Sequence, residues 1–147
     1  MHSDIFGNLT EWGRVIETLD RLKELKQLDR NQDGLTRILR YRDNWQLRET
    51  VLKHIVHLTE PTEELVREVI NITADEYIYL DMRILAVDAL SKLIPLCIKR
   101  GDFKDPNLVE IAIENINKLL NSPQPPLLHE AVTNALKTVR KTRESGF

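Results

Sequence analysis

The chain has 147 residues, of which 41% are hydrophobic and 30% are charged, so its composition is that of a globular protein and excludes a disordered one. A chain of this length can bury roughly two thirds of the surface that it exposes when unfolded, which predicts a single domain over residues 1–147. The net charge of −2 excludes a global positive field that would attract nucleic acid or anionic lipid. The single cysteine, Cys97, excludes an internal disulfide and a metal cage built from cysteines.

Two features of the chain bear on its location. The densest apolar stretch, Leu93 to Ile98, is too short to cross a bilayer. Residues 1–4 are mostly polar, and they lead into no apolar core of signal-peptide length. We therefore expect a protein without a membrane span, located in the cytoplasm.

Apolar residues recur three and four positions apart along the chain, which predicts about seven helices and no strand. The first helix is expected over residues 8–28, with Asn8 and Glu11 forming a capping box at its start. Its apolar residues are mostly three apart, so its apolar stripe drifts around the helix. This drift favours a helix that lies across one end of a helix stack.

Three helix pairs are expected to follow over residues 33–141. The first pair combines a short helix, after a polar break at residues 29–34, with a second helix that starts near Trp45. The second pair starts at Pro61. Its long second helix is expected to kink or end at Pro95, because proline lacks an amide hydrogen and clashes with the preceding turn.

The third pair is expected to begin at Asp105, which can cap a helix, with Pro106 in the first helical position. A proline-rich turn at residues 122–126 separates its two helices, and the last helix is expected to run to about Lys141. Residues 142–147 are expected to form a frayed tail.

The second helix of each predicted pair carries one pattern of residue types. An apolar residue is followed by a basic one, and then by small or apolar residues that share one helix face. The three copies begin 35 and then 46 residues apart, which is close to the spacing of helix-pair repeats. Their members are Leu47, Arg48, Val51, His54, Ile55 and Leu58; then Met82, Arg83, Ala86, Ala89, Leu90 and Leu93; and last Leu128, His129, Val132, Ala135, Leu136 and Val139.

This pattern resembles the second helix of HEAT repeats, in which an apolar residue and an arginine are followed by alanines and leucines that face the next repeat. The resemblance covers residues 33–141 and is strongest from Met82 to Leu93. It implies an all-α superhelix of about three HEAT-like helix pairs, preceded by an N-terminal helix. The residues agree with this expectation, because small side chains such as Ala86 and Ala89 let helices approach closely, and both are predicted to be buried.

Residues 29–34 match the first half of a calcium-binding EF-hand loop, with oxygen-bearing side chains at the first, third and fifth positions and Gly34 at the sixth. The match then fails, because Arg40 occupies the twelfth position, where a bidentate glutamate should complete the ligand shell. We favour a turn in which Asp33 caps the next helix, and calcium binding is the alternative.

The remaining candidates for chemistry have simple structural interpretations. His54 and His57 lie three apart without a clear third ligand, so no metal site is expected; His54 should face the core and His57 the solvent. Cys97 is predicted to be a buried, inert thiol. Because the chain also lacks a glycine-rich phosphate loop and the motifs of hydrolases and metalloproteases, we expect neither a cofactor nor catalytic activity.

Charged residues are unevenly distributed along the chain. Basic residues exceed acidic ones between Leu35 and His57 and again near the C-terminus, whereas residues 60–115 are acidic. The basic residues are Arg37, Arg40, Arg42, Arg48 and Lys53, and then Lys137, Arg140, Lys141 and Arg143. Phosphate contacts at both ends would resemble those of a HEAT-like DNA glycosylase family, so binding of a nucleic-acid backbone is the alternative function. The acidic middle argues against it.

The favoured function is that of a non-catalytic interaction module that binds a protein or peptide. Residues that escape the core on the second helices should form ladders along a concave face, and one such ladder consists of Glu49, Ile84 and Glu130. Ile84 would be an apolar centre with a polar rim, the usual form of an interaction hot spot, unless other contacts bury it. The residues predicted to share the binding surface are Lys53, His57, Ile84, Asp88, Lys92 and Asn134.

Overall fold

The computed structural model of the protein describes residues 4–101 and 103–145, and within these ranges it contains seven α-helices, two short 3₁₀ helices and no strand. The α-helices are α1 (Trp12–Glu24), α2 (Gln32–Leu39), α3 (Trp45–His54), α4 (Glu63–Ala74), α5 (Leu80–Arg100), α6 (Leu108–Leu120) and α7 (Pro126–Ser145). The 3₁₀ helices are η1 (Leu28–Asn31) and η2 (Ile55–His57). The all-α prediction is therefore confirmed. Across the described ranges, each helix is too short or too polar to cross a bilayer.

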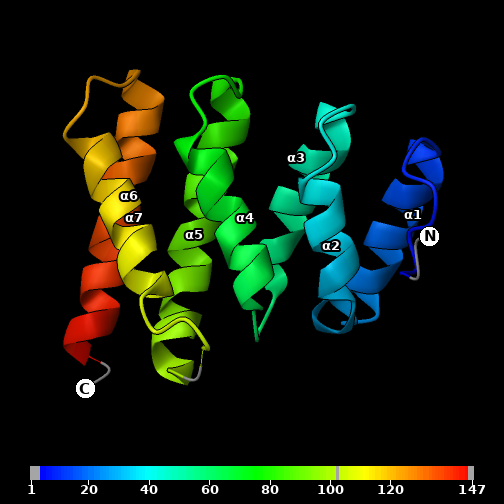
Figure 1. Ribbon diagram of the computed structural model, residues 1–147, viewed down its shortest axis with the longest axis horizontal. Coiled ribbons are helices and arrows are strands. Elements are labelled where there is room, and N and C mark those ends of the chain that lie inside the picture. The colour runs from blue at the N-terminus through cyan, green and yellow to red at the C-terminus, as the bar shows by residue number, and fades with distance from the viewer. Residues whose placement is uncertain (1–3, 102, 146–147) are drawn as a thin grey trace.

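The helices pack in two layers (Figure 1). Helices α1, α3, α5 and α7 follow one another in the first layer, and α2, α4 and α6 do so in the second. Contacts between the layers join α2 to α3, α4 to α5 and α6 to α7, so that three helix hairpins lie side by side along the longest axis. One hydrophobic core extends through all of them, from Phe6 to Val139.

Helix α5 has the most packing partners, because it contacts α3, α4, α6 and α7. Ala86 and Ala89 on α5 are fully buried, as predicted. Their small side chains allow the neighbouring helices to approach closely. Pro95 does not end α5, so that part of the prediction is wrong: the helix continues to Arg100 and ends at Gly101, which adopts a left-handed φ of +64°. Burial of the flanking apolar side chains outweighs the one hydrogen bond that proline removes.

Two buried arginines join the helices of the first two hairpins. The Arg48 guanidinium of α3 donates to the Leu39 carbonyl at the end of α2, at 2.9 Å. Arg83 of α5 donates to the Thr73 carbonyl in the last turn of α4, at 2.9 and 3.3 Å. Carbonyls at helix C-termini lack a partner within their own helix, so each arginine satisfies one of them. His129, which the sequence pattern aligns with these arginines, is exposed on α7.

The first helix is shorter than predicted. It spans Trp12–Glu24 and not residues 8–28, because Lys26 adopts a left-handed φ of 57° and breaks the helical path. The predicted capping box is wrong as well. The Asn8 side chain accepts hydrogen bonds from the amide and hydroxyl of Thr10, at 3.0 and 2.8 Å, in a turn that precedes the helix.

The segment before α1 packs against α2. The Arg37 side chain of α2 donates to both carboxylate oxygens of Asp4, each at 2.7 Å, and to the Gly7 carbonyl at 2.8 Å. Phe6 is buried beside Gly34, where a Cβ atom would lie 2.5 Å from the phenyl ring. Gly34 therefore permits a close side-chain approach and does not form a sharp turn.

Residues 29–34 are helical, in η1 and the first turn of α2, so the predicted turn with Asp33 as its cap is wrong. The Asp29 carboxylate accepts hydrogen bonds from the backbone amides of Thr59 and Glu60, at 3.0 and 2.8 Å. These bonds tie the start of the first hairpin to the connection that precedes α4. The acidic side chain that would be the first ligand of a calcium loop thus has a structural role.

The last two helices also differ in their bounds from the prediction. Helix α6 begins at Leu108, and Asp105 accepts a hydrogen bond from the Asn107 amide at 2.9 Å in the turn before it. Asp105 and Pro106 therefore lie outside the helix that they were expected to start. Helix α7 continues through residues 142–145, beyond the end predicted near Lys141, and Arg143 forms an ion pair with Glu110 of α6. Residues 146–147 lie outside the described ranges.

Enlarging either Ala86 or Ala89 to leucine should destabilise the protein by about 1 to 3 kcal/mol, because the extra atoms overpack a filled core. Urea or guanidinium unfolding of Ala86→Leu and Ala89→Leu measures this free energy. Lys137→Leu, at an exposed position of α7, is the control and should stay within about 0.5 kcal/mol of the parent protein. Unchanged denaturation midpoints for both alanine variants would contradict the packing described for α5.

Two glycines within helices should respond to alanine in opposite directions. Gly34→Ala gains up to about 1 kcal/mol in helix propensity but displaces the buried Phe6 ring, whose burial is worth about 1.5 to 3 kcal/mol, so a net loss of about 1 kcal/mol is expected. At Gly13 of α1 a Cβ meets nothing within 4 Å, so Gly13→Ala should be neutral or stabilising. Thermal or denaturant unfolding compares the two. A Gly34→Ala variant as stable as Gly13→Ala would show that Phe6 does not depend on Gly34.

Candidate functional site

A hollow of about 470 Å³ spans α3, α5 and α7. Its lining consists of Glu49 and Lys53 from α3, Asp81, Ile84, Leu85 and Asp88 from α5, and Leu127, Glu130, Ala131 and Asn134 from α7. We call this hollow the α3–α5–α7 groove. It crosses the whole width of one helix and reaches onto both of its neighbours in the same layer.

The floor of the groove follows from the packing of α5. Nine of the 21 residues of α5 are buried, the helix packs against four neighbouring helices, and its outer stripe contains residues that recur three and four apart. Asp81 and Asp88 are exposed on this stripe, and Ile84 and Leu85 between them are half-buried against the edge of the core. The stripe therefore presents two apolar side chains between two carboxylates.

The groove brings together four of the six residues that were predicted to share a binding surface, namely Lys53, Ile84, Asp88 and Asn134. Ile84 is partly buried against the core and also lines the groove. Lys92 is exposed one helical turn beyond Asp88 and is not part of the lining. His57 lines a separate pocket together with Lys23 and Lys26.

Several lining residues were not singled out in the sequence, among them Asp81, Leu127 and Ala131. Asp81 and Leu127 immediately precede Met82 and Leu128, which start the second and third copies of the pattern. A ladder drawn one position before the start of the pattern on each second helix would have included both residues. Ala131 is almost fully buried and reaches the groove only through the fit of α7 against α5, for which the pattern holds no signal.

The groove is acidic. Four carboxylates and one lysine line it, which gives a net charge of −3. The lysine is already engaged, because the Lys53 ammonium lies 3.1 Å from a Glu49 carboxylate oxygen. Among the residues that the structure describes, Asp81, Asp88 and Glu130 have no cationic side chain within ion-pair distance.

Two of these carboxylates titrate away from their ordinary range. Partial desolvation raises the pKa of Asp88 although its side chain is exposed, and the nearby Lys92 ammonium opposes this shift only in part. The hydroxyl of Tyr79 donates a hydrogen bond to Glu49, which lowers the pKa of that carboxyl. The Glu49 carboxyl is therefore ionised at neutral pH, and the Asp88 carboxyl lies at the edge of the apolar floor.

Exposed aromatic side chains adjoin the groove. The rings of Trp45 and Tyr79 meet edge to face with their centroids 5.6 Å apart, and the Tyr79 hydroxyl reaches Glu49 of the groove. Trp45 is 53% exposed and Leu127 is 63% exposed. These large side chains lie at the N-terminal ends of α3, α5 and α7, so the apolar surface continues past the groove along one end of this layer.

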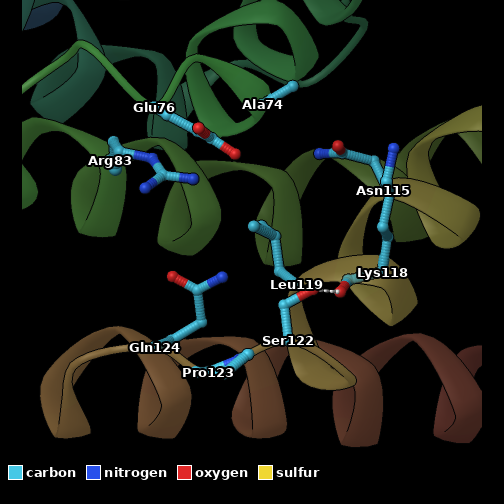
Figure 2. Close-up of a pocket in the computed structure, with 9 residues that line it drawn as sticks. All are labelled: Ala74, Glu76, Arg83, Asn115, Lys118, Leu119, Ser122, Pro123 and Gln124. Atoms are coloured by element: carbon cyan, nitrogen blue, oxygen red, sulfur yellow. Dashed lines mark hydrogen bonds between the residues drawn. The ribbon is translucent and has the colours of Figure 1, made fainter.

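A second hollow, of about 500 Å³, lies at the C-terminal end of α4 beside α5 and α6. Figure 2 shows its polar lining: Arg83 and Glu76 lie on one side of the hollow, Lys118 lies across from them, and Gln124 lies on a third side. Its buried polar groups already serve the fold. Arg83 binds the end of α4, as described above, and the Asn115 amide donates to the Thr73 hydroxyl. We therefore interpret this hollow as a structural boundary where neighbouring hairpins pack together.

The histidines and the cysteine are placed as the sequence predicts. His54 is buried with Nδ1 2.7 Å from the Thr50 carbonyl and Nε2 2.9 Å from an Asp20 carboxylate oxygen, whereas His57 is exposed. Cys97 is buried, and desolvation raises the pKa of its thiol to about 12, so the thiol stays protonated. Within the described ranges, no three histidine, cysteine or acidic side chains are grouped so that they could hold a metal ion.

Most of the basic cluster between Leu35 and His57 is neutralised within the fold. Arg37 pairs with Asp4, and Arg48 is buried against the end of α2. The remaining members form ion pairs as well: Arg40 with Glu68 at 3.0 Å, Arg42 with Asp75 at 3.9 Å, and Lys53 with Glu49. This part of the predicted phosphate-contacting surface is therefore not a free positive patch.

Replacing Asp88 by asparagine should raise the free energy of unfolding at pH 7. A folded-state pKa above that of the unfolded chain means that the ionised carboxylate opposes folding, and asparagine removes this charge. The gain should shrink as the pH falls through the ordinary range of aspartate, near about 3.9, because the parent side chain is then neutral in both states. Denaturant unfolding between pH 3 and pH 7 measures it. Asp43→Asn, at an exposed site, is the control, and a loss of stability in Asp88→Asn would contradict the argument.

We found no match to this chain among protein family models, curated proteins or solved structures. Among the described residues, the groove combines apolar side chains with carboxylates that have no cationic side chain within ion-pair distance. Carboxylates beside aliphatic side chains can contribute both desolvation energy and directional charge to an interface.

Proposed function

We propose that this protein is a non-catalytic interaction module, in which three HEAT-like helix pairs stack as a short superhelix and bind a protein or peptide. The α3–α5–α7 groove is the docking surface. The observation that carries the proposal is the apolar floor of Ile84, Leu85 and Leu127, framed by polar side chains from three consecutive second helices.

The repeat part of the proposal is supported by the two buried arginines. Arg48 and Arg83 occupy equivalent positions of the sequence pattern, and each donates to a carbonyl at the end of the preceding helix. Equivalent residues with equivalent bonds are what a repeated helix pair should contain. The contacts of α3 with α5, and of α5 with α7, are those of neighbouring repeats in such a stack.

Binding of a nucleic-acid backbone is the alternative function, and the charges disfavour it. Phosphates would be repelled by a groove with a net charge of −3, and the arginines near α2 are paired. The observation in its favour is a shallow pocket on α7 lined by Lys137, Arg140 and Lys141. We therefore keep it as an outcome of the experiment below.

Substituting aspartate into the groove should release the native partner. Proteins captured from a lysate of the native cell by the parent chain are compared with those captured by Ile84→Asp and by Leu127→Asp. A buried carboxylate opposes apolar docking, so at least about a tenfold loss of affinity, roughly 1.4 kcal/mol, is expected for each variant. Leu127 is 63% exposed, so its substitution tests the groove without disturbing the core.

The matched control is Ile111→Asp, at a 39% exposed isoleucine of α6 in the other layer. It should retain every partner that the parent chain retains. If both groove variants also retain all partners at unchanged affinity while circular dichroism shows normal helix content, the docking assignment is wrong. Captured material that is lost on nuclease treatment, and whose affinity falls steeply with salt, would instead favour the nucleic-acid alternative.

A further inference from the structure

We propose that the occupant of the α3–α5–α7 groove is a cationic amphipathic helix of a partner protein. Its apolar face would contact the floor of the groove, and its lysine or arginine side chains would pair with Asp81, Asp88 and Glu130. This inference rests on the proposed docking function and adds the chemical class of the partner.

The charge of the occupant follows from the unpaired carboxylates. Asp81 and Asp88 lie about two helical turns apart on α5, and Glu130 extends from α7 on the far side of the apolar floor. Lys53 is the one cation in the lining, and Glu49 already neutralises it. An acidic or neutral occupant would bring these carboxylates out of water without compensation, whereas a cationic one pairs them.

The apolar character of the occupant follows from the floor between these carboxylates. Ile84 and Leu85 are half-buried and Leu127 is 63% exposed, so all three present apolar surface to the groove. A highly charged but wholly polar segment would leave this surface in contact with water. A segment with one apolar face and one basic face satisfies both parts of the groove.

The helical conformation of the occupant follows from the all-α surface that receives it. An extended segment pairs its backbone amides and carbonyls with a strand edge or with polar side chains, and the lining offers no strand edge and a single amide side chain, Asn134. A helix satisfies its backbone groups internally. Three neighbouring helices at spacings of about 8 to 10 Å present a surface roughly 20 Å wide, which a helix of about 14 residues spans.

The aromatic pair beside the groove extends the same surface. Trp45 is 53% exposed and packs edge to face against Tyr79, whose hydroxyl binds the groove residue Glu49. An exposed indole face attracts lysine and arginine side chains, so a basic residue at one end of the helix would contact Trp45. Trp45 is therefore also a spectroscopic reporter of binding.

The test uses the full chain and two synthetic peptides of about 14 residues with leucines on one helical face. One peptide carries lysine and the other glutamate at all polar positions. Trp12→Phe removes the other tryptophan of the chain, so that Trp45 fluorescence reports binding, and titration calorimetry gives the affinities. The leucine–lysine peptide should bind at least about tenfold more tightly than the leucine–glutamate peptide.

Neutralising the groove should abolish this preference. The triple variant Asp81→Asn, Asp88→Asn and Glu130→Gln is expected to bind the leucine–lysine peptide at least about tenfold more weakly. The control triple variant, Glu17→Gln, Glu24→Gln and Glu114→Gln, removes the same charge from exposed positions of α1 and α6 and should lose less than about threefold. Ile84→Ala combined with Leu127→Ala should also weaken binding, whereas Leu25→Ala combined with Ile111→Ala should not.

The inference is overturned if the leucine–lysine peptide does not bind, if it binds no more tightly than the glutamate peptide, or if both triple variants lose affinity equally. The last result would mean that the peptide follows overall charge and not the groove. Failure of the proposed function is distinguished by the capture of native partners, which uses no peptide and depends on Ile84→Asp and Leu127→Asp. If those variants lose their native partners while the two peptides bind equally well, the proposed docking function is supported. The proposal that its partner is a cationic helix is then wrong.

Discussion

Close packing around α5 is the constraint on which the other features of the structure depend. This helix contacts α3 and α7 in its own layer and α4 and α6 in the other, and Ala86 and Ala89 keep the distances short. Burial on so many sides leaves α5 a narrow exposed stripe, and that stripe forms the floor of the groove. The same packing places α3 and α7 on either side of this floor as the walls of the groove. The groove and the core therefore result from the same helix contacts.

The fold uses its positive and negative charges differently. Arg37, Arg40 and Arg42 pair with acidic side chains from other segments, and Arg48 and Arg83 satisfy carbonyls at helix ends. The groove carboxylates have no such partners among the described residues. A net charge of −2 for the whole chain thus conceals a local imbalance, because the groove lining alone carries four carboxylates and one lysine.

An ionised carboxylate beside an aliphatic floor is unfavourable for the isolated protein. Desolvation raises the pKa of Asp88, so its charge opposes folding at neutral pH, and the exposed Leu127 and Trp45 contribute little to the core. Residues that do not stabilise the chain in isolation are typical of surfaces that acquire partners in a complex. In our proposal, the bound helix covers the apolar floor and pairs with the carboxylates, and so removes both unfavourable features of the isolated protein.

The sequence by itself determined the helical class, most helix positions, the burial of Ala86 and Ala89, and four residues of the groove, because periodic apolar spacing reports which side of a helix meets the core. Tertiary structure decided the features that depend on contacts between distant segments. Two long-range contacts determine the structure at the ends of the first helices, namely that of Phe6 with Gly34 and that of Asp29 with residues 59–60. Packing also allows α5 to continue past Pro95. The acidity of the groove was likewise decided in three dimensions, since the chain order does not state which charges find partners.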